Sequence, residues 1–187
     1  MIIIDMGIYF LRHIKTEDNL VGKISGRSES PTLPAQKLNI TCKIEKRFDQ
    51  IYCSPYNRCR ETIALLPSEL QCNVCFTPTL IERGLGILEG MDRKDAIHQF
   101  PQMFENGKLK VDAQISGIES IEEAQHRLKI LLDVLKSNRY KQVLICSHNQ
   151  TLKILLAELK GILITNYYWQ TVNFKNGELV CIDTFSK

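Results

Sequence analysis

Short apolar runs alternate with longer amphipathic segments along this chain of 187 residues. The runs at 2–11, 49–53 and 143–146 have few polar breaks, which is typical of strands buried on both faces of a parallel sheet. A further strand is predicted at 73–77. Polar residues follow these runs, so each strand is expected to end at a polar edge.

Segments between the strands carry helix signals. Ser54 can cap free amides and Pro55 suits a first helical turn, so a helix is predicted from there to about Leu70. Ser120 and Glu123 form a capping box before a long apolar face. We expect helices at 33–47, 54–70, 92–99, from Ser120 to about 135, and 151–159.

The remaining segments are predicted to be loops and a hairpin. Residues 14–32 and 78–91 are rich in turn residues. Residues 167–174 and 179–185 flank Asn176-Gly177 and predict a hairpin, whose edge strand offers a surface for a homodimer. The alternation of strands and helices predicts one domain over residues 1–187, a three-layer α/β/α sandwich with a mainly parallel central sheet.

Composition and charge argue against several classes of protein but do not indicate a function. A net charge of +3 is too small to indicate binding to nucleic acid or to an anionic membrane. Asp5 interrupts the apolar start, so an export signal is not expected, and no stretch approaches the ~20 apolar residues of a membrane span. The odd number of cysteines, 7, predicts free thiols and a cytoplasmic protein. The CxxC at Cys72 and Cys75 has no second pair of ligands, so neither a metal nor a cofactor is expected.

Candidate chemistry gathers at the predicted strand ends. Arg12-His13 follows the first strand, Ser54 the second, and Ser147-His148 the fourth. Ligands of such sheets bind beyond the carboxyl ends of the strands. Because two of only 4 histidines fall there, packing alone is a poor explanation for them.

Two further side chains point to an anionic substrate. Arg58 lies in the first turn of a predicted helix and would bring a planar fork of donors to the same edge. Glu82 follows a strand and precedes a turn-rich segment. Two imidazoles, one carboxylate and these arginines suit a phosphoryl group, and the loop adds Lys15, Lys23 and Arg27. The glycine-rich nucleotide motifs do not occur.

These residues resemble the signature of the histidine phosphatase superfamily, the phosphoglycerate mutase-like proteins. The family opens with a strand and R-H-G, and here Leu11-Arg12-His13-Ile14 stands in that place. The other motifs follow in order along nearly the whole chain. They are Asn19 and Ser25-Gly26, Ser54 through Thr62 for S-P-x-x-R-A-x-x-T, Leu80 through Gly90 for L-x-E-x-x-x-G-x-x-E-G, Gly117 through Ser120 with Arg127, and Ser147-His148-Asn149.

The resemblance implies a histidine acid-type phosphatase, a phosphoric monoester hydrolase. His13 would attack phosphorus and form a phosphohistidine, while Arg12, Arg58 and His148 bind the phosphoryl oxygens. Glu82 would protonate the leaving oxygen and then activate water. The implied substrate-binding residues are Asn19, Ser25, Gly26, Arg83, Asn149 and Gln150. The partner expected is a small phosphorylated substrate.

Two alternatives remain open on the sequence. A cofactor-dependent phosphoglycerate mutase shares the pocket, but only residues 91–116 are available for the longer insertion that such enzymes usually carry. A member that binds a phosphorylated ligand without turnover is the other. Its support is Ile14, which replaces the family's glycine and would be strained at a positive φ.

Overall fold

Within residues 6–182, which the computed structural model describes, six strands form the central sheet in the order β2-β8-β1-β7-β3-β4. All neighbouring pairs are parallel except β8, which runs antiparallel to β1. The mainly parallel sheet is therefore confirmed. The strands are β1 (Gly7–Arg12), β2 (Asn39–Ile40), β3 (Gln50–Cys53), β4 (Val74–Phe76), β7 (Gln142–Ser147) and β8 (Glu178–Ile182).

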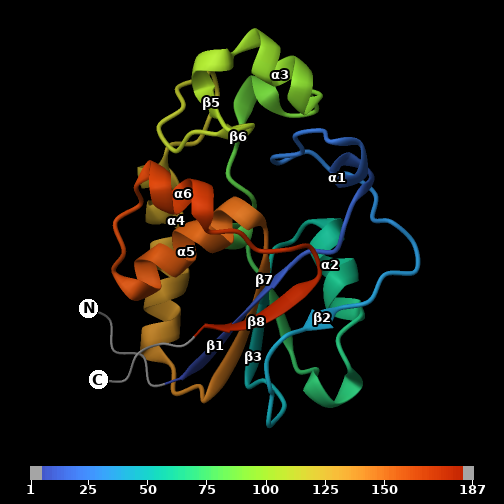
Figure 1. Cartoon of the computed structure of the whole chain (residues 1–187). Coiled ribbons are helices and arrows are strands. Elements are labelled where there is room, and N and C mark those ends of the chain that lie inside the picture. Colours follow the sequence, from blue (N-terminus) through green and yellow to red (C-terminus); the bar gives the residue numbers. More distant parts are fainter. Residues whose placement is uncertain (1–5, 183–187) are drawn as a thin grey trace.

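Both faces of the sheet are covered, which explains the unbroken apolar runs. Ile8 and Phe10 of β1 pack with residues of α4 (Ile121–Ser137), α5 (Asn149–Lys160) and α6 (Asn166–Thr171). Tyr9 and Leu11 point to the other face, where α2 (Asn57–Ala64) lies. Successive strand residues face opposite sides, so a strand between two helical layers must be apolar throughout. Figure 1 shows these three layers.

A smaller lobe stands beyond the carboxyl ends of the central strands (Figure 1). It contains α3 (Arg93–Gln99), β5 (Phe104–Glu105) and β6 (Lys108–Leu109), with α1 (Glu17–Val21) beside it. Leu85, Leu88 and Phe104 belong to its own buried cluster. Backbone pairing of Lys23 with Asp92 joins the loop after β1 to this lobe. The lobe therefore brings residues near 23 and 93 to the edge where β1 and β7 end.

The prediction of a helix over 33–47 is wrong. Ala35 has a φ of 54°, a left-handed angle that a helix does not accept, and the segment holds only the short β2. The Gln36 side chain binds both backbone groups of Lys15, with N···O distances of 2.8 and 2.9 Å. Conversely, the predicted loop at 14–32 contains α1, whose capping box joins Thr16 and Asn19.

The prediction of a terminal hairpin is also wrong. Residues 166–171 form α6, which is capped by the hydroxyl of Thr165. β8 pairs with β1 on one side and with β2 on the other, so it is not an edge of the sheet. Residues 183–185 of the predicted strand, like residues 2–5 of the first, lie outside the described part of the chain. The homodimer stays a prediction, without that edge to support it.

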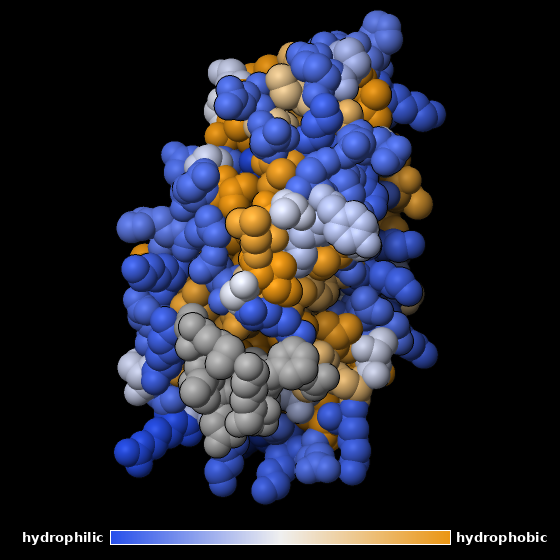
Figure 2. Space-filling model, turned by 60° about the vertical axis from the view of Figure 1, so that its left-hand side comes forward, coloured by the Kyte–Doolittle hydropathy of each residue, from blue (hydrophilic) through white to orange (hydrophobic). Residues whose placement is uncertain are grey.

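The other helices agree with their sequence signals apart from their ends. The capping box of Ser120 and Glu123 is present at the start of α4. α2 begins at Asn57 rather than at Ser54 and ends at Ala64 rather than near Leu70. α5 begins at Asn149 rather than at 151. Figure 2 shows the face that carries α4, α5 and α6, where an apolar area is bordered by hydrophilic side chains. Among the described residues, no helix is both long enough and apolar enough to cross a membrane.

Candidate active site

His13 lies at the end of β1, buried and held in one orientation. Its Nδ1 is 2.7 Å from the carbonyl oxygen of Ile14, so Nδ1 carries the hydrogen and donates it. The lone pair is then on Nε2, the nitrogen that a nucleophilic imidazole needs free. Burial lowers the pKa of His13 well below 6.5, and the charges of Arg12 and Arg58 lower it further. His13 is therefore neutral at neutral pH, as attack on phosphorus requires.

His148 follows β7 and stands beside His13, with 5.2 Å between the ring centroids. Arg58 Nε donates to its Nδ1 at 3.2 Å, so the ring hydrogen is on Nε2, 2.8 Å from the hydroxyl oxygen of Ser54. Burial lowers the pKa of His148 well below 6.5, with further lowering by His13 and the arginines. The sequence Ser54-Pro55 predicts that Ser54 caps α2, but its hydroxyl binds His148 instead.

Two arginines bring positive charge to this edge. Arg58 is buried, and its terminal nitrogens donate to the carbonyl oxygens of Ser28 and Gly26 at 2.7 and 2.9 Å. Arg12 donates to the carbonyl of Phe174 at 2.7 Å, while its Nε is buried and without a partner among the described residues. Desolvation lowers the pKa of Arg12 to about 10 despite the nearby Glu82, so it stays charged at neutral pH. An unpartnered buried donor is costly unless a ligand satisfies it.

Glu82 is the acidic group of the site. Its Oε1 accepts hydrogen bonds from the backbone amides of Arg83 and Thr151, at 2.9 and 3.0 Å. Its Oε2 accepts only the amide of Gln150, at 3.3 Å. The carboxylate therefore caps the first turn of α5 from a distant segment, and Oε2 keeps the free lone pair.

These groups surround one polar cavity of about 110 Å³. It is lined by Arg12, His13, Asn19, Lys23, Ile24, Ser25, Gly26, Arg58, Glu82, Arg93, His148, Asn149 and Gln150. The structure thus brings together ten of the eleven residues predicted for the site. Its volume suits a phosphoryl group, and its charge is mostly positive.

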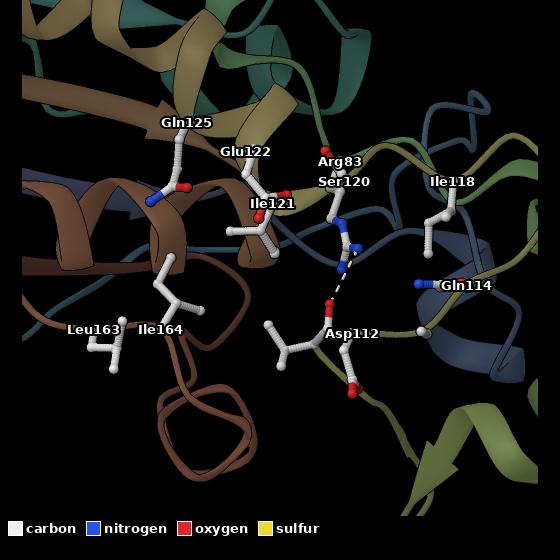
Figure 3. A pocket seen from close by; sticks show the side chains of 12 residues that line it. Arg83, Asp112, Gln114, Ile118, Ser120, Ile121, Glu122, Gln125, Leu163 and Ile164 are labelled. Carbon is white, nitrogen blue, oxygen red and sulfur yellow. Dashed lines mark hydrogen bonds between the residues drawn. The ribbon is translucent and has the colours of Figure 1, made fainter.

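Arg83 is the predicted residue that lies elsewhere. Its side chain is buried on the far side of Gln150 and lines a neighbouring pocket of about 440 Å³. There it donates to the carbonyl oxygens of Glu119 and Val111, at 2.7 and 3.5 Å. Figure 3 shows Arg83 among the lining side chains, with the bond to Val111 dashed. Arg83 follows Glu82 directly, but the two side chains line different pockets.

Arg93 is the charged cavity residue that the sequence did not reveal. It begins α3 in the small lobe, and its amide binds the carbonyl oxygen of Gly22 at 3.1 Å. The sequence indicates Lys23 only as one charge of a basic loop. No motif links positions 23 and 93, because pairing between two loops brings them together.

The sequence profile of the histidine phosphatase superfamily (branch 1) matches residues 8–186. The chain belongs to this superfamily. It is 28% identical over 166 residues to a proposed phosphoserine phosphatase of Hydrogenobacter thermophilus, covering 86% of this chain and 82% of that one. It is 26% identical over 165 residues to a probable phosphoglycerate mutase, GpmB, of Shigella dysenteriae, covering 83% of this chain and 75% of the other.

The fold is that of phosphoglycerate mutase-like phosphatases. The crystal structure of the α-ribazole phosphatase from Shigella flexneri superposes with a TM-score of 0.74 at 22% identity, covering 95% of this chain and 90% of the other. The architecture expected from the superfamily's motifs is therefore confirmed.

Ile14 stands where the superfamily's R-H-G motif has its glycine, and it has ordinary backbone angles. Within residues 6–182 only Ala35 and Asn106 are non-glycine residues with positive φ. Ile14 is buried, its amide donates to the Thr62 hydroxyl at 2.9 Å, and its carbonyl holds His13. Asn176 Nδ2 donates to the carbonyl of His13 at 3.0 Å and clamps the same turn. Ile14 therefore holds His13 in place without backbone strain.

Proposed function

We propose that this protein is a metal-independent phosphomonoester hydrolase that forms a phosphohistidine on His13 and acts on a small phosphorylated metabolite. The observation that carries the proposal is the fixed tautomer of His13. Its Nδ1–H is held by Ile14, while Nε2 has no hydrogen-bond partner among the described residues and lies beside two arginines. Phosphoryl transfer needs such positioning and fixed positive charge. The phosphatase names of relatives in the superfamily agree with it.

In the first step, His13 Nε2 attacks phosphorus and forms the N–P bond. The bond to the leaving oxygen breaks, and that oxygen takes the proton of Glu82 Oε2. In the second step, water attacks phosphorus and gives a proton back to Oε2. The N–P bond breaks, and Nε2 regains its lone pair. This is the chemistry of a histidine acid-type phosphatase.

The arginines would stabilise the charge of the transferring phosphoryl group. Arg12 Nε has no partner among the described residues and is the first candidate donor. Both ring nitrogens of His148 already bind protein groups, so a phosphoryl oxygen reaches its N–H only if the Ser54 bond opens. We therefore assign His148 first to holding Arg58 and second to binding phosphate.

Lys23 and Arg93 extend the proposal to the rest of the substrate. Both line the cavity, but they are distinct from the groups around His13, which are Arg12, Arg58, Glu82 and His148. Neither Lys23 nor Arg93 forms an ion pair with a described residue. A substrate with a second anionic group, a carboxylate or another phosphate, would satisfy them.

The test is hydrolysis of p-nitrophenyl phosphate by wild-type protein and by His13→Ala. We expect phosphate release that His13→Ala abolishes and EDTA leaves unchanged. Acid-labile ³²P on the wild type, absent from the variant, would mark the phosphohistidine.

A second assay with 3-phosphoglycerate and 2,3-bisphosphoglycerate separates phosphatase from mutase. Interconversion of phosphoglycerates faster than phosphate release would support the mutase, the activity in the name of one relative. Wild-type protein that binds phosphate but turns over neither substrate would refute both enzymes.

A further inference from the structure

The hydroxyl of Thr151 contacts the carboxylate of Glu82 from the first turn of α5. Thr151 is buried, and its Oγ1 lies 3.1 Å from Glu82 Oε1 and 2.7 Å from the carbonyl oxygen of Ile81. Its backbone amide also donates to Oε1, at 3.0 Å. One residue thus offers two donors to one carboxylate oxygen, while its hydroxyl has a second acceptor within reach.

A hydroxyl has one hydrogen, so it cannot satisfy both acceptors at once. A third neighbour restricts its choice further. Arg127 Nη2 donates to the same Oγ1 at 3.4 Å and occupies one of its lone pairs. Arg127 is itself held by Glu119, with N···O distances of 2.8 and 3.1 Å. The hydrogen of Thr151 is therefore left with two positions, toward Oε1 or toward Ile81.

The two oxygens of Glu82 are not equivalent. Oε1 faces three donors, the amide of Arg83 and both groups of Thr151. Oε2 accepts a single amide, that of Gln150, which lines the cavity as Glu82 itself does. A proton on Oε1 would collide with donors, whereas Oε2 has a free lone pair. The proton that Glu82 exchanges with substrate and water is therefore carried by Oε2.

We propose that Thr151 is a positioning residue whose hydroxyl hydrogen points to Glu82 Oε1 when the carboxylate is ionised and to Ile81 when Oε2 carries the proton. This inference rests on the proposed acid–base role of Glu82. No bond to Thr151 is made or broken, because its hydrogen only rotates about the C–O bond. The hydroxyl thus holds the carboxylate while it is ionised, between the first proton transfer and the second.

The experiment compares the pH dependence of kcat/KM in wild type, Thr151→Val and Thr151→Ser. Valine keeps the shape and the amide but loses the donor to the ionised carboxylate, so Glu82 keeps its proton to higher pH. We expect the alkaline limb of the kcat/KM profile, which Glu82 sets as the proton donor of the first step, to move up by about one pH unit. Serine restores the wild-type position of that limb.

Thr171→Val is the matched control, since Thr171 lies on α6 outside the cavity. A Thr151→Val profile that overlays the wild type would overturn the inference. So would a Thr151→Ser profile that shifts like valine. If Thr151→Val does not fold, Thr151→Ala removes the same hydroxyl. The same limb of its kcat/KM profile is then expected to move up.

Titration of the Glu82 side-chain carboxyl by ¹³C NMR is a readout that does not depend on turnover. If His13→Ala keeps wild-type activity, the proposed function fails, whatever Thr151 does. If His13→Ala is inactive but Thr151→Val leaves the NMR titration unchanged, only the inference about Thr151 fails.

Discussion

Lys23 and Arg93 differ from the other cationic side chains of the cavity in the groups that they contact. Arg12 and Arg58 line the cavity with His13 and also bind backbone carbonyls. Lys23 and Arg93 come from the loop after β1 and from α3, and both side chains lack an ion-pair partner in residues 6–182. At the level of single residues, we expect these two side chains to bind a substrate's second anionic group.

We expect Lys23→Ala and Arg93→Ala each to raise KM about three- to tenfold for a phosphorylated carboxylic acid such as phosphoserine, because one charge-assisted hydrogen bond is lost. KM for p-nitrophenyl phosphate, which has no second anionic group, should change less than about twofold. Lys94→Ala is the control, since Lys94 is the exposed neighbour that does not line the cavity. Equal effects on both substrates would contradict this assignment.

The segment that carries Glu82 is positioned by a second loop. Residues near 84–87 run beside residues 116–119, and the carbonyl oxygen of Gly84 accepts the amide of Glu119 at 2.9 Å. Gly86 has a φ of 57°, and a Cβ there would lie 2.1 Å from the carbonyl oxygen of Ser116. Gly90 has a φ of 82° with nothing within 4 Å of such a Cβ.

Alanine substitutions at Gly86 and Gly90 separate the cost of a left-handed backbone angle from the cost of a steric clash. Gly90→Ala should cost about 1–2 kcal/mol of unfolding free energy, the cost of a left-handed angle. Gly86→Ala adds a clash between backbone segments and should cost more than about 3 kcal/mol, or prevent folding. Urea denaturation measures both. Equal losses in the two variants would show that the close contact with Ser116 does not matter.

At the scale of the whole molecule, two buried imidazoles couple stability to pH. The folded state keeps His13 and His148 neutral because burial lowers their pKa values well below 6.5. The unfolded chain protonates them near a pKa of about 6.5. Below that pH the unfolded state binds more protons than the folded state, so the free energy of unfolding falls as pH falls.

We expect the free energy of unfolding to decrease from about pH 6.5 to about pH 5 by up to about 1.4 kcal/mol per pH unit for each of the two histidines. His148→Asn should make the dependence shallower by about one histidine's share, whatever its effect at neutral pH. His98→Asn, at an exposed position, should leave the slope unchanged. Chemical denaturation at each pH gives the slopes, and an unaltered slope in His148→Asn would contradict the linkage.

Local patterns in the sequence determined the strands, most helices and the catalytic candidates. Buried parallel strands must be apolar on both faces, so short apolar runs were enough to predict β1, β3 and β7. Polar residues directly after such strands meet at one edge, so the chain alone predicts that His13, His148 and Glu82 lie together. The resemblance to the family's motifs supplied the catalytic roles expected of these residues.

Tertiary contacts decided the rest. The segment 33–47 is not helical, because Gln36 binds the backbone of Lys15 and Ala35 turns left-handed. Residues 166–171 became a helix, Ser54 bound His148, and Arg83 turned away from the cavity. The contacts of Thr151 and Arg93 join segments far apart in the chain. Sequence spacing carries no signal for such contacts, because their geometry exists only once the sheet, α5 and the small lobe have packed.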